Sequence, residues 1–393
     1  MLAGTRRDGL MEGALPVSLY IHLPWCVRKC PYCDFNSHKA GSDPPWDRYV
    51  SAVVAEIEQE APLASGRSVE TIFIGGGTPS LFSPDRVASI INACRQYCSL
   101  ASDCEITMEA NPGTVEHGSL RDYRAAGVNR LSIGAQSFDP EILKILGRVH
   151  GPAEIVSSFE EANNAGFESI NIDLMFALPG QTVSAAEADI NRLIGLSPEH
   201  VSWYQMTLEP NTVFYYRPPP GIPGEELAWE IQQAGSSLLD SAGYEQYEIS
   251  AFARPGHRCR HNLNYWQFGD YLGVGAGAHG KLTDIDKSVR RYQKPANPIA
   301  YMQQVEAVEV GAVLAKVDPD DLGFEFMLNA LRLVDGVPVS LLRERTGLGE
   351  GALTAIIEVA VEDGLMDHPA SGRLRPTTDG FRFLNELQAR FLA

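Results

Sequence analysis

The chain has 393 residues, of which 44% are hydrophobic and 21% are charged, and its formal net charge is −18 at pH 7. This composition is typical of a globular protein with a large core, and the negative charge disfavours broad binding to nucleic acids or to anionic membrane surfaces. No apolar run approaches the roughly 18–20 residues of a membrane span, no secretion signal is recognisable, and the seven cysteines fit a reducing compartment, so we expect a cytoplasmic protein.

Stretches typical of strands and of helices alternate after an N-terminal tail, residues 1–15, which has the character of a disordered segment. Strands are predicted at residues 17–23, 70–74, 104–109, 130–135, 169–176 and 200–208. Connections long enough to hold a helix predict that these strands are parallel, and right-handed crossovers would curl the sheet into a barrel. The predicted fold class is therefore α/β, a partial (β/α)6 barrel related to the TIM barrel.

Three cysteines follow the first predicted strand at short spacings: Cys26, Cys30 and Cys33. Thiolates select zinc, copper(I) or iron–sulfur clusters. A structural zinc site uses four protein ligands, usually in two separated pairs, whereas three thiolates on a [4Fe–4S] cluster leave one iron open for another ligand. The alternatives are a zinc site or three unreactive cysteines. A second group of three cysteines, between residues 94 and 104, is better explained by small buried hydrophobes than by a second cluster.

The spacing C-x3-C-x2-C, with Tyr32 before the third cysteine, resembles the radical S-adenosylmethionine (SAM) superfamily. This resemblance implies that the open iron binds the amine and carboxylate of SAM, and that an electron from the cluster releases a 5′-deoxyadenosyl radical. Further motifs follow in order: Gly-Gly-Gly-Thr-Pro-Ser at 75–80, Glu-Ala-Asn-Pro-Gly-Thr at 109–114, Ser-Ile-Gly-Ala-Gln-Ser-Phe at 132–138 and Asn-Ile-Asp-Leu-Met-Phe from 171. Together they make residues 17–281 resemble the oxygen-independent coproporphyrinogen III oxidase family.

Polar residues and glycines gather where the predicted strands end, which is where α/β folds bind ligands. Glycines 75–77 lack a Cβ and let the backbone approach a ligand, while Glu109, Gln136 and Asp173 offer acceptors and Arg148 offers a donor for a carboxylate. Taken singly, such residues are more often surface or capping residues. The family resemblance implies SAM contacts at Tyr20, Tyr32, Gly76, Gly77, Thr78, Glu109, Gln136, Arg148, Asp173 and Thr207.

Two features depart from the true coproporphyrinogen oxidases of this family. Those enzymes carry a further cysteine two residues after the third cluster ligand, where this chain has Phe35. They also carry a long N-terminal extension, where only residues 1–16 precede the first predicted strand of this chain. Both features argue against the oxidative decarboxylation of coproporphyrinogen III as its reaction.

A second motif, His261-Asn-x-x-Tyr-Trp266, follows a proline-rich connector and a predicted helix at residues 225–242. On chemistry alone, a capped turn with a buried Tyr–Trp pair is the simpler explanation. However, the motif resembles the signature of the HemW heme chaperones, a neutral imidazole can bind heme iron, and aromatic rings offer flat surface to a macrocycle. His261 is therefore the leading candidate for a heme ligand, and Cys259 is a secondary heme contact. His279, in a glycine-rich turn, is interpreted as structural or close to the SAM site.

The last part of the chain has the pattern of a small separate domain. Predicted helices at 324–333, 339–345, 351–363 and 378–391, with a short strand near residue 374, resemble a winged-helix fold. From residue 339 onward there are six arginines and eight acidic residues, so the basic face of a DNA-reading helix is missing and a packing or lid role is expected. The predicted divisions are a tail (1–15), a radical SAM partial barrel (16–215), an accessory region with the heme motif (216–310) and a winged-helix-like domain (311–393).

The sequence thus predicts a radical SAM protein that binds heme and transfers it to acceptor proteins, with a [4Fe–4S] cluster, SAM and heme as cofactors. In this hypothesis the protein is a carrier, and whether it is also an enzyme stays open. The alternatives are an anaerobic coproporphyrinogen III oxidase and a methyl transfer that opens the heme ring. Expected partners are heme-acceptor proteins, contacted in part at the membrane periphery, an electron donor such as flavodoxin or ferredoxin, and a second copy of the chain, but no nucleic acid.

Overall fold

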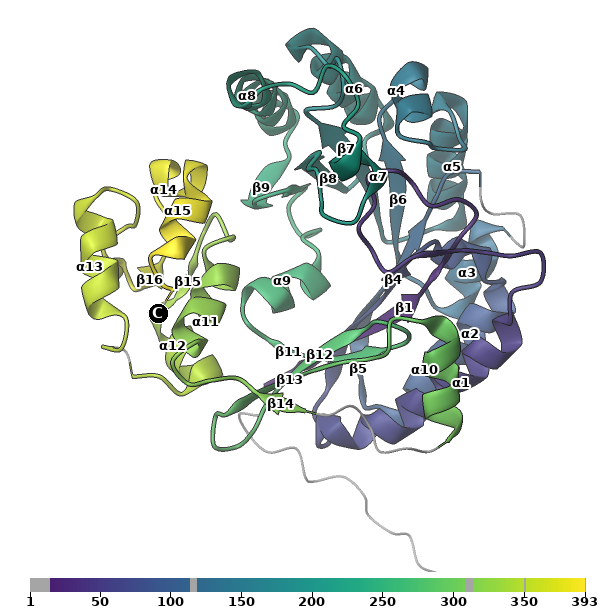
Figure 1. Cartoon of the computed structure of the whole chain (residues 1–393), viewed down its shortest axis with the longest axis horizontal. Helices are drawn as coiled ribbons and strands as arrows, with labels where there is room; N and C mark the ends of the chain where they lie inside the picture. Colours follow the sequence, from purple (N-terminus) through teal and green to yellow (C-terminus); the bar gives the residue numbers. More distant parts are fainter. Residues whose placement is uncertain (1–14, 114–118, 308–313, 350, 393) are drawn as a thin grey trace, which may run out of the picture.

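A single sheet organises the chain. The structure, a computed structural model, describes residues 15–113, 119–307, 314–349 and 351–392, so nearly all of the predicted tail lies outside the described residues. Twelve strands form the sheet, in the order β14-β13-β12-β11-β1-β4-β5-β6-β7-β8-β10-β9 (Figure 1). The predicted α/β fold, a partial barrel with a mostly parallel sheet, is confirmed.

All six predicted strands are present, and each is parallel to its neighbours in chain order. They are β1 (Val17–Leu23), β4 (Val69–Gly76), β5 (Leu100–Ala110), β6 (Arg130–Gln136), β7 (Ser169–Phe176) and β8 (His200–Gln205). All seven residues of β6 are buried: Leu131, Ile133 and Ala135 belong to the main hydrophobic core, and the residues between them face an interior cavity. The ends differ from prediction: β5 begins at Leu100, where it pairs with Val69, and β8 ends three residues before the predicted end.

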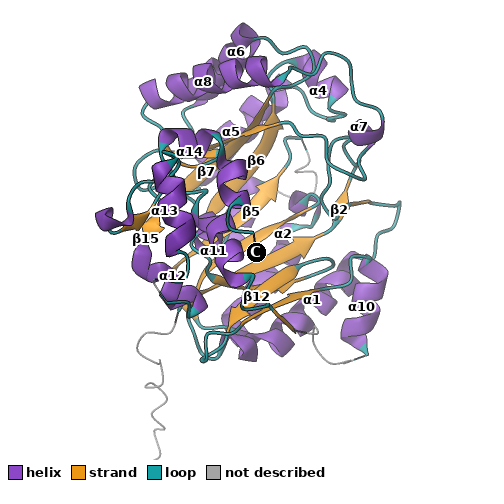
Figure 2. Cartoon of the chain, turned by 60° about the vertical axis from the view of Figure 1, so that its left-hand side comes forward, coloured by secondary structure: helices purple, strands orange, loops and turns teal. Residues whose placement is uncertain are grey.

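Most of the helices line the outer face of this sheet (Figure 2). Those of the barrel and its extension are α1 (Trp46–Glu60), α2 (Pro84–Tyr97), α3 (Leu120–Ala126), α4 (Pro140–Ile145), α5 (Pro152–Ala165), α6 (Val183–Leu196), α7 (Val213–Tyr216), α8 (Glu225–Ser241), α9 (Arg260–Trp266) and α10 (Pro298–Glu306). Short 3-10 turns occur at Ala61–Ala64, Pro79–Leu81 and Pro369–Ser371. Proline opens α2, α4, α5 and α10, where its missing N–H costs no helical hydrogen bond. None of the described helices is long and apolar enough to cross a membrane.

The region after residue 216 extends the same sheet at both edges. The strand β11 (Asp270–Val274) pairs in parallel with β1, with Val17 opposite Asp270, so one more parallel strand is present than was predicted. The remaining edge strands are antiparallel: β9 (Glu245–Glu248), β10 (Ala251–Ala253), β12 (His279–Thr283), β13 (Val289–Gln293) and β14 (Ala315–Lys316). The cysteine loop carries its own small pair, β2 (Trp25–Cys26) with β3 (His38–Lys39).

The C-terminal residues fold around a second hydrophobic core that includes Phe326, Leu342, Ile357 and Leu387. Their elements are α11 (Leu322–Ala330), β15 (Val337–Pro338), α12 (Val339–Thr346), α13 (Thr354–Glu362), β16 (Arg373–Leu374), α14 (Thr378–Arg382) and α15 (Leu384–Ala389). The single final helix predicted at 378–391 is therefore two helices, because Phe383 between them has non-helical backbone angles (φ −103°, ψ 38°). The antiparallel pair β15–β16 supplies the short wing.

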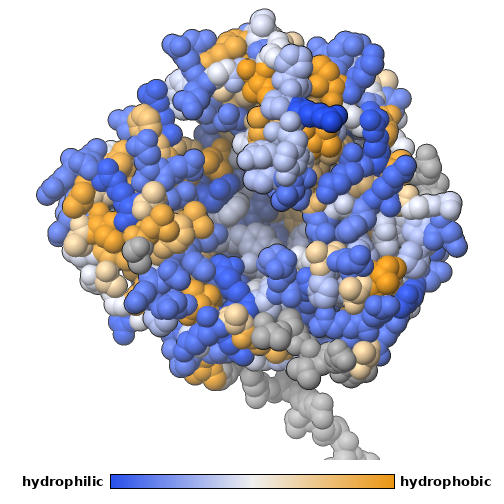
Figure 3. Space-filling model, viewed as in Figure 1, coloured by the Kyte–Doolittle hydropathy of each residue, from blue (hydrophilic) through white to orange (hydrophobic). Residues whose placement is uncertain are grey.

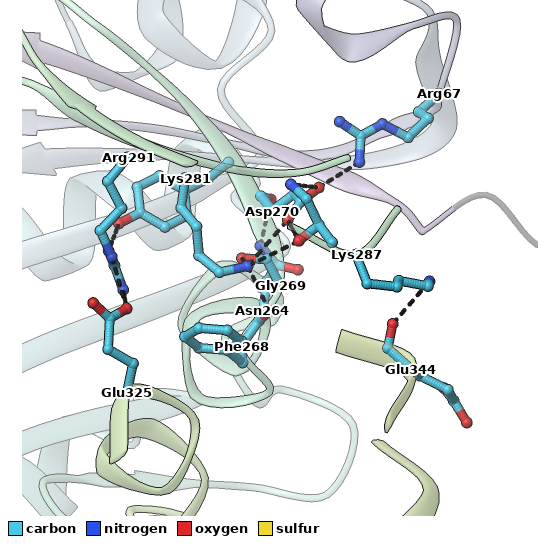
Figure 4. A network of polar contacts seen from close by, with 12 residues as sticks. Arg67, Asn264, Phe268, Gly269, Asp270, Lys281, Lys287, Arg291, Glu325 and Glu344 are labelled. Carbon is cyan, nitrogen blue, oxygen red and sulfur yellow. Dashed lines mark hydrogen bonds and ion pairs between the residues drawn. The ribbon is translucent and has the colours of Figure 1, made fainter. Parts of the chain in front are cut away.

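Charged contacts join this domain to the edge of the sheet (Figure 4). Arg291 on β13 donates twice to the Glu325 carboxylate on α11, at 2.6 and 2.8 Å, and Lys287 donates to the main-chain carbonyl of Glu344. Behind them Asp270, fully buried, accepts from Arg67 at 2.5 Å and from Lys281 at 3.1 Å. The helix α9 lies between the sheet and the C-terminal domain (Figure 1).

Candidate functional site

The cysteine loop leaves β1 at the carboxyl end of the sheet. Cys26 is held in β2, opposite Lys39, and a turn joins Cys33 N–H to the carbonyl of Cys30 at 3.2 Å. The three predicted cluster ligands, all partly buried, line one cavity of about 560 Å³. Figure 3 shows the hollow on the face between the barrel and the C-terminal domain.

The three cysteines are the ligand type that an iron–sulfur cluster needs. A cubane takes one thiolate on each iron, so three cysteines could hold three of its four irons. Among the described residues, no group of three His, Cys, Asp or Glu side chains is placed to hold a single metal ion. Burial raises the pKa of the Cys26 and Cys33 thiols, and cationic iron would be needed to hold them as thiolates. Arg148 Nη1 donates to Cys30 Sγ at 3.7 Å.

The structure brings most of the predicted SAM contacts to this cavity. Those that line it are Tyr32, Gly76, Gly77, Thr78, Glu109, Gln136, Arg148, Asp173 and Thr207. Tyr20 lines an adjoining cavity of about 380 Å³, to which Gly76 and Glu109 also contribute. His261 lines neither cavity. The roles of these residues stay predictions, but their convergence from five strands of the sheet is what a ligand site requires.

The glycine turn after β4 packs directly on the cysteine loop. A Cβ on Gly77 would come within 2.6 Å of the main-chain oxygen of Trp25, next to Cys26, so no larger residue fits without displacing the loop. The N–H of Gly76 donates to Glu109 Oε2 at 3.0 Å. The turn therefore ties the cysteine loop to the end of β5, and it leaves the backbone open toward the cavity.

A polar network that sequence reasoning missed positions the predicted SAM contacts. Arg148 Nη2 donates to Asn111 Oδ1 at 2.5 Å and to the carbonyl of Gly134 at 2.7 Å. Asn111 in turn donates to Thr78 Oγ1, and the Tyr204 hydroxyl donates to Gln136 Oε1 at 2.6 Å. Asn111 stands in the motif that supplied Glu109, and Tyr204 stands on the last predicted strand, so the same strand-end signal could have found both.

The surroundings of Glu109 raise the pKa of its carboxyl group. Burial, together with the negative charge of Asp173, raises its pKa to about 7, although the bond from Gly76 opposes the shift. Asp173 is half-buried at the cavity wall, like Glu109, and accepts from Asn171 at 2.7 Å and from Ser132 at 3.2 Å. Two neighbouring carboxylates of this kind favour a cationic ligand group, such as an ammonium or a sulfonium.

A pH dependence follows from Glu109. Because its pKa is higher in the folded than in the unfolded protein, its contribution to stability is present below about pH 4.5 and is lost as the pH rises through about 7. Glu109→Gln should therefore gain stability over the wild type as the pH rises from 5 to 8, by about 2–3 kcal/mol at most. Urea denaturation of both proteins without SAM, at the two pH values, measures this difference. An unchanged difference between pH 5 and pH 8 would contradict the assignment.

The heme motif forms α9, whose two faces meet different surroundings. Cys259, Asn262 and Trp266 line the larger cavity. His261 points the other way and is buried, with burial lowering its pKa to about 3. Its Nδ1 lies 2.7 Å from Thr71 Oγ1 and its Nε2 lies 3.0 Å from the Tyr265 hydroxyl. The predicted heme role of His261 stays untested, and in this conformation both of its nitrogens are occupied.

The C-terminal domain completes the far end of the larger cavity. Arg332, just after α11, stacks on the Trp266 ring at 4.2 Å and lies 3.8 Å from the Glu248 carboxylate. Within the described residues, Arg332 Nε, Trp266 Nε1 and Glu248 Oε2 are buried without a hydrogen bond. Buried polar groups in this state are rare and usually meet water or a ligand. The cavity therefore has a polar inner end that the sequence motif alone did not reveal.

Comparison with known proteins gives the family. Residues 20–193 match the radical SAM superfamily model, and residues 317–383 match the HemN C-terminal domain model. The protein called heme chaperone HemW in Escherichia coli K12 is 46% identical over 381 residues, 96% of this chain and 98% of that relative. The chain belongs to the HemW family, within the radical SAM superfamily. The HemW of Haemophilus influenzae is 44% identical over the same shares of both chains.

A solved structure agrees with this HemW assignment. The coproporphyrinogen III oxidase HemN from Escherichia coli, described as a radical SAM enzyme, superposes with a TM-score of 0.80 at 25% identity, covering 96% of this chain and 90% of that one. The predicted resemblance to HemW and to the wider HemN-like family is thus confirmed. Membership of the radical SAM superfamily brings with it a [4Fe–4S] cluster and SAM.

Proposed function

We propose that this protein is a heme chaperone, which binds heme and delivers it to acceptor proteins. The observation that carries the proposal is the match to relatives named heme chaperones along almost the whole of both chains. Phe35 supports it, because it stands where the oxidases of the resembled family carry a further cysteine. The aromatic motif on α9, placed beside two adjoining cavities, offers the flat surface that a macrocycle needs.

The cysteine cavity would hold the cluster and SAM in this proposal. Cys26, Cys30 and Cys33 would bind three irons, and SAM would bind the fourth and could supply radical chemistry there. Glu109 and Asp173 would attract the cationic part of SAM, and Arg148 would attract its carboxylate. The glycine turn at 75–77 would leave room for the methionine moiety of SAM. Tyr20, Tyr32, Gln136 and Thr207 would complete the contacts.

The remaining expectations also belong to the proposal. We assign the binding of the cluster and SAM to the barrel at residues 16–215, heme binding to residues 216–310, and a covering role to the domain at residues 311–393. The Arg291–Glu325 ion pair would hold the last two divisions together. We place the protein in the cytoplasm, with heme-acceptor proteins, some of them at the membrane periphery, a flavodoxin- or ferredoxin-like electron donor, and a second copy of the chain as partners.

Heme delivery tests the proposal. Protein reconstituted with cluster and loaded with heme should reactivate a heme-free peroxidase faster than heme bound to serum albumin does, at equal heme concentration. The physical reason is that a chaperone site releases heme to a partner rather than to water. Equal or slower reactivation than with albumin would count against the proposal.

A second candidate function is favoured by the HemN structure, whose title names coproporphyrinogen III oxidase activity and which superposes over most of both chains. Incubation with coproporphyrinogen III, SAM and a reductant without oxygen separates the two. We expect no decarboxylated porphyrin product, with a HemN oxidase as the positive control. Product formation at a rate comparable to that control would establish the second function instead.

A further inference from the structure

The smaller cavity has the walls of an aromatic ligand site. It lies beside the larger one and shares Gly76 and Glu109 with it. Its sides include the rings of Tyr20, Tyr265 and Tyr271, and the last two meet edge to face with centroids 4.6 Å apart. Flat aromatic walls of this kind suit a planar apolar molecule.

Histidines in and around the two cavities differ in whether a ring nitrogen is available. His22 is bonded to the Tyr20 hydroxyl at 2.9 Å and to the carbonyl of Asn36 at 2.8 Å. His200 is bonded to Asn171 at 2.6 Å and to Tyr247 at 2.8 Å. His261 is likewise bonded at both nitrogens. A metal ligand needs an unshared electron pair on nitrogen, and each of these rings would first have to give up a hydrogen bond.

Among the described histidines that line the two cavities, which are His22, His200 and His279, His279 is the exception. It is the first residue of β12, it lines the smaller cavity and it is exposed to solvent. Its ring makes no hydrogen bond within the described residues. Partial burial and the nearby positive charge of Arg291 lower its pKa, which keeps the imidazole neutral at pH 7.

The hydrogen bonds of His261 indicate a structural role for its ring. The Thr71 hydroxyl donates its only proton to Ser18 Oγ at 2.8 Å, so it must accept from His261 Nδ1–H. The other nitrogen, Nε2, then accepts from the Tyr265 hydroxyl. His261 thereby fixes the orientation of Tyr265, which is a wall of the smaller cavity. It is a positioning residue in this arrangement.

We propose that His279, and not His261, is the protein ligand of the heme iron, and that the smaller cavity receives the macrocycle between its tyrosines. The inference rests on the proposed heme-binding function and deepens it. It also explains why the motif on α9 contains both a histidine and a tyrosine four residues apart, since that spacing brings their side chains together on one helix face. Heme at His279 would lie beside the SAM site, because the two cavities share residues.

Ligand replacement tests the proposal on the full-length protein with its cluster. Hemin is added to the wild type, His279→Ala, His261→Ala and, as a control, His257→Ala, which is on the same segment as His261 but lines neither cavity. Absorption and electron paramagnetic resonance spectra report the axial ligand. We expect His279→Ala to lose the histidine-ligand spectrum and added imidazole to restore it, while His257→Ala matches the wild type.

His261→Ala should keep the histidine-ligand spectrum, with weaker hemin binding because Tyr265 is no longer held. Circular dichroism shows whether this buried substitution still folds, and His261→Gln, which keeps one hydrogen bond, serves as a second variant. The proposal is overturned if His279→Ala retains the wild-type spectrum, or if a His261 variant loses it and imidazole restores it. If the wild type binds no hemin at all, the proposed function itself fails, and the inference with it.

Discussion

Replacing Cys30 by serine is expected to abolish the iron–sulfur cluster. Cys30 lines the larger cavity together with Cys26 and Cys33. A cubane with only two thiolates would leave a second iron without a protein ligand. A serine hydroxyl is a harder and far less acidic ligand than a thiol, so it does not substitute for one. After anaerobic reconstitution, iron content should fall from about four atoms per chain to near zero, with loss of the visible absorption of the cluster.

Cys98→Ser provides the matched control for that experiment. Cys98 is also partly buried, but it caps α2 and lines neither cavity. It should keep the wild-type iron content. Equal iron in Cys30→Ser and the wild type would contradict the assignment of the cluster, and equal loss in both variants would show that the effect is not specific to the site.

Asp270→Leu should produce the largest loss of stability. The Asp270 and Lys281 side chains are 0% and 2% exposed, and removal of the carboxylate would leave the ammonium group buried over the Phe268 ring without its partner (Figure 4). Burial alone would raise the pKa of Asp270, but Lys281 and Arg67 hold it below its usual range, whereas burial lowers the pKa of Lys281 to about 8. We take the pair to be ionised at neutral pH, because two cations and the Thr283 hydroxyl all donate to Asp270. Breaking such a pair costs about 3–5 kcal/mol, measured by urea denaturation.

Two further variants separate the charge effect from packing. Asp270→Leu combined with Lys281→Met removes the buried ammonium together with its partner and should recover part of the loss, while Arg67 still lacks its carboxylate. Asp47→Leu removes an exposed partner of Arg86 and should leave the stability unchanged. A double variant as unstable as Asp270→Leu alone would show that the unpaired lysine does not cause the loss.

The sheet and the rim of the site were predictable because both follow from local patterns. A strand such as β6 carries apolar residues at alternate positions, Leu131, Ile133 and Ala135. Ligand residues stand at or next to strand ends, as Glu109 and Gln136 do, and Asp173 lies three residues before the end of β7. The strand β11 was not predicted, because its membership in the sheet depends on pairing with β1, some 250 residues earlier in the chain. No local sequence pattern indicates that β11 pairs with β1.

The orientation of α9 could not be predicted from the sequence either. The motif showed that a histidine, a tyrosine and a tryptophan lie within one and a half turns of helix, but not which of them faces a cavity. That depends on Thr71 of β4 and Ser18 of β1, which hold His261 in the core. For the same reason His279, in a glycine-rich turn, was interpreted as structural or close to the SAM site, and the sequence did not show that β12 presents it to the smaller cavity.

The most direct test of the heme-chaperone account is the absorption spectrum of anaerobically reconstituted protein during titration with heme. The account predicts that the cluster absorption persists while a Soret band grows and saturates, since the cysteine loop and the aromatic cavity are adjoining sites in one chain. A chain that assembles the cluster but shows no saturable Soret band would contradict it.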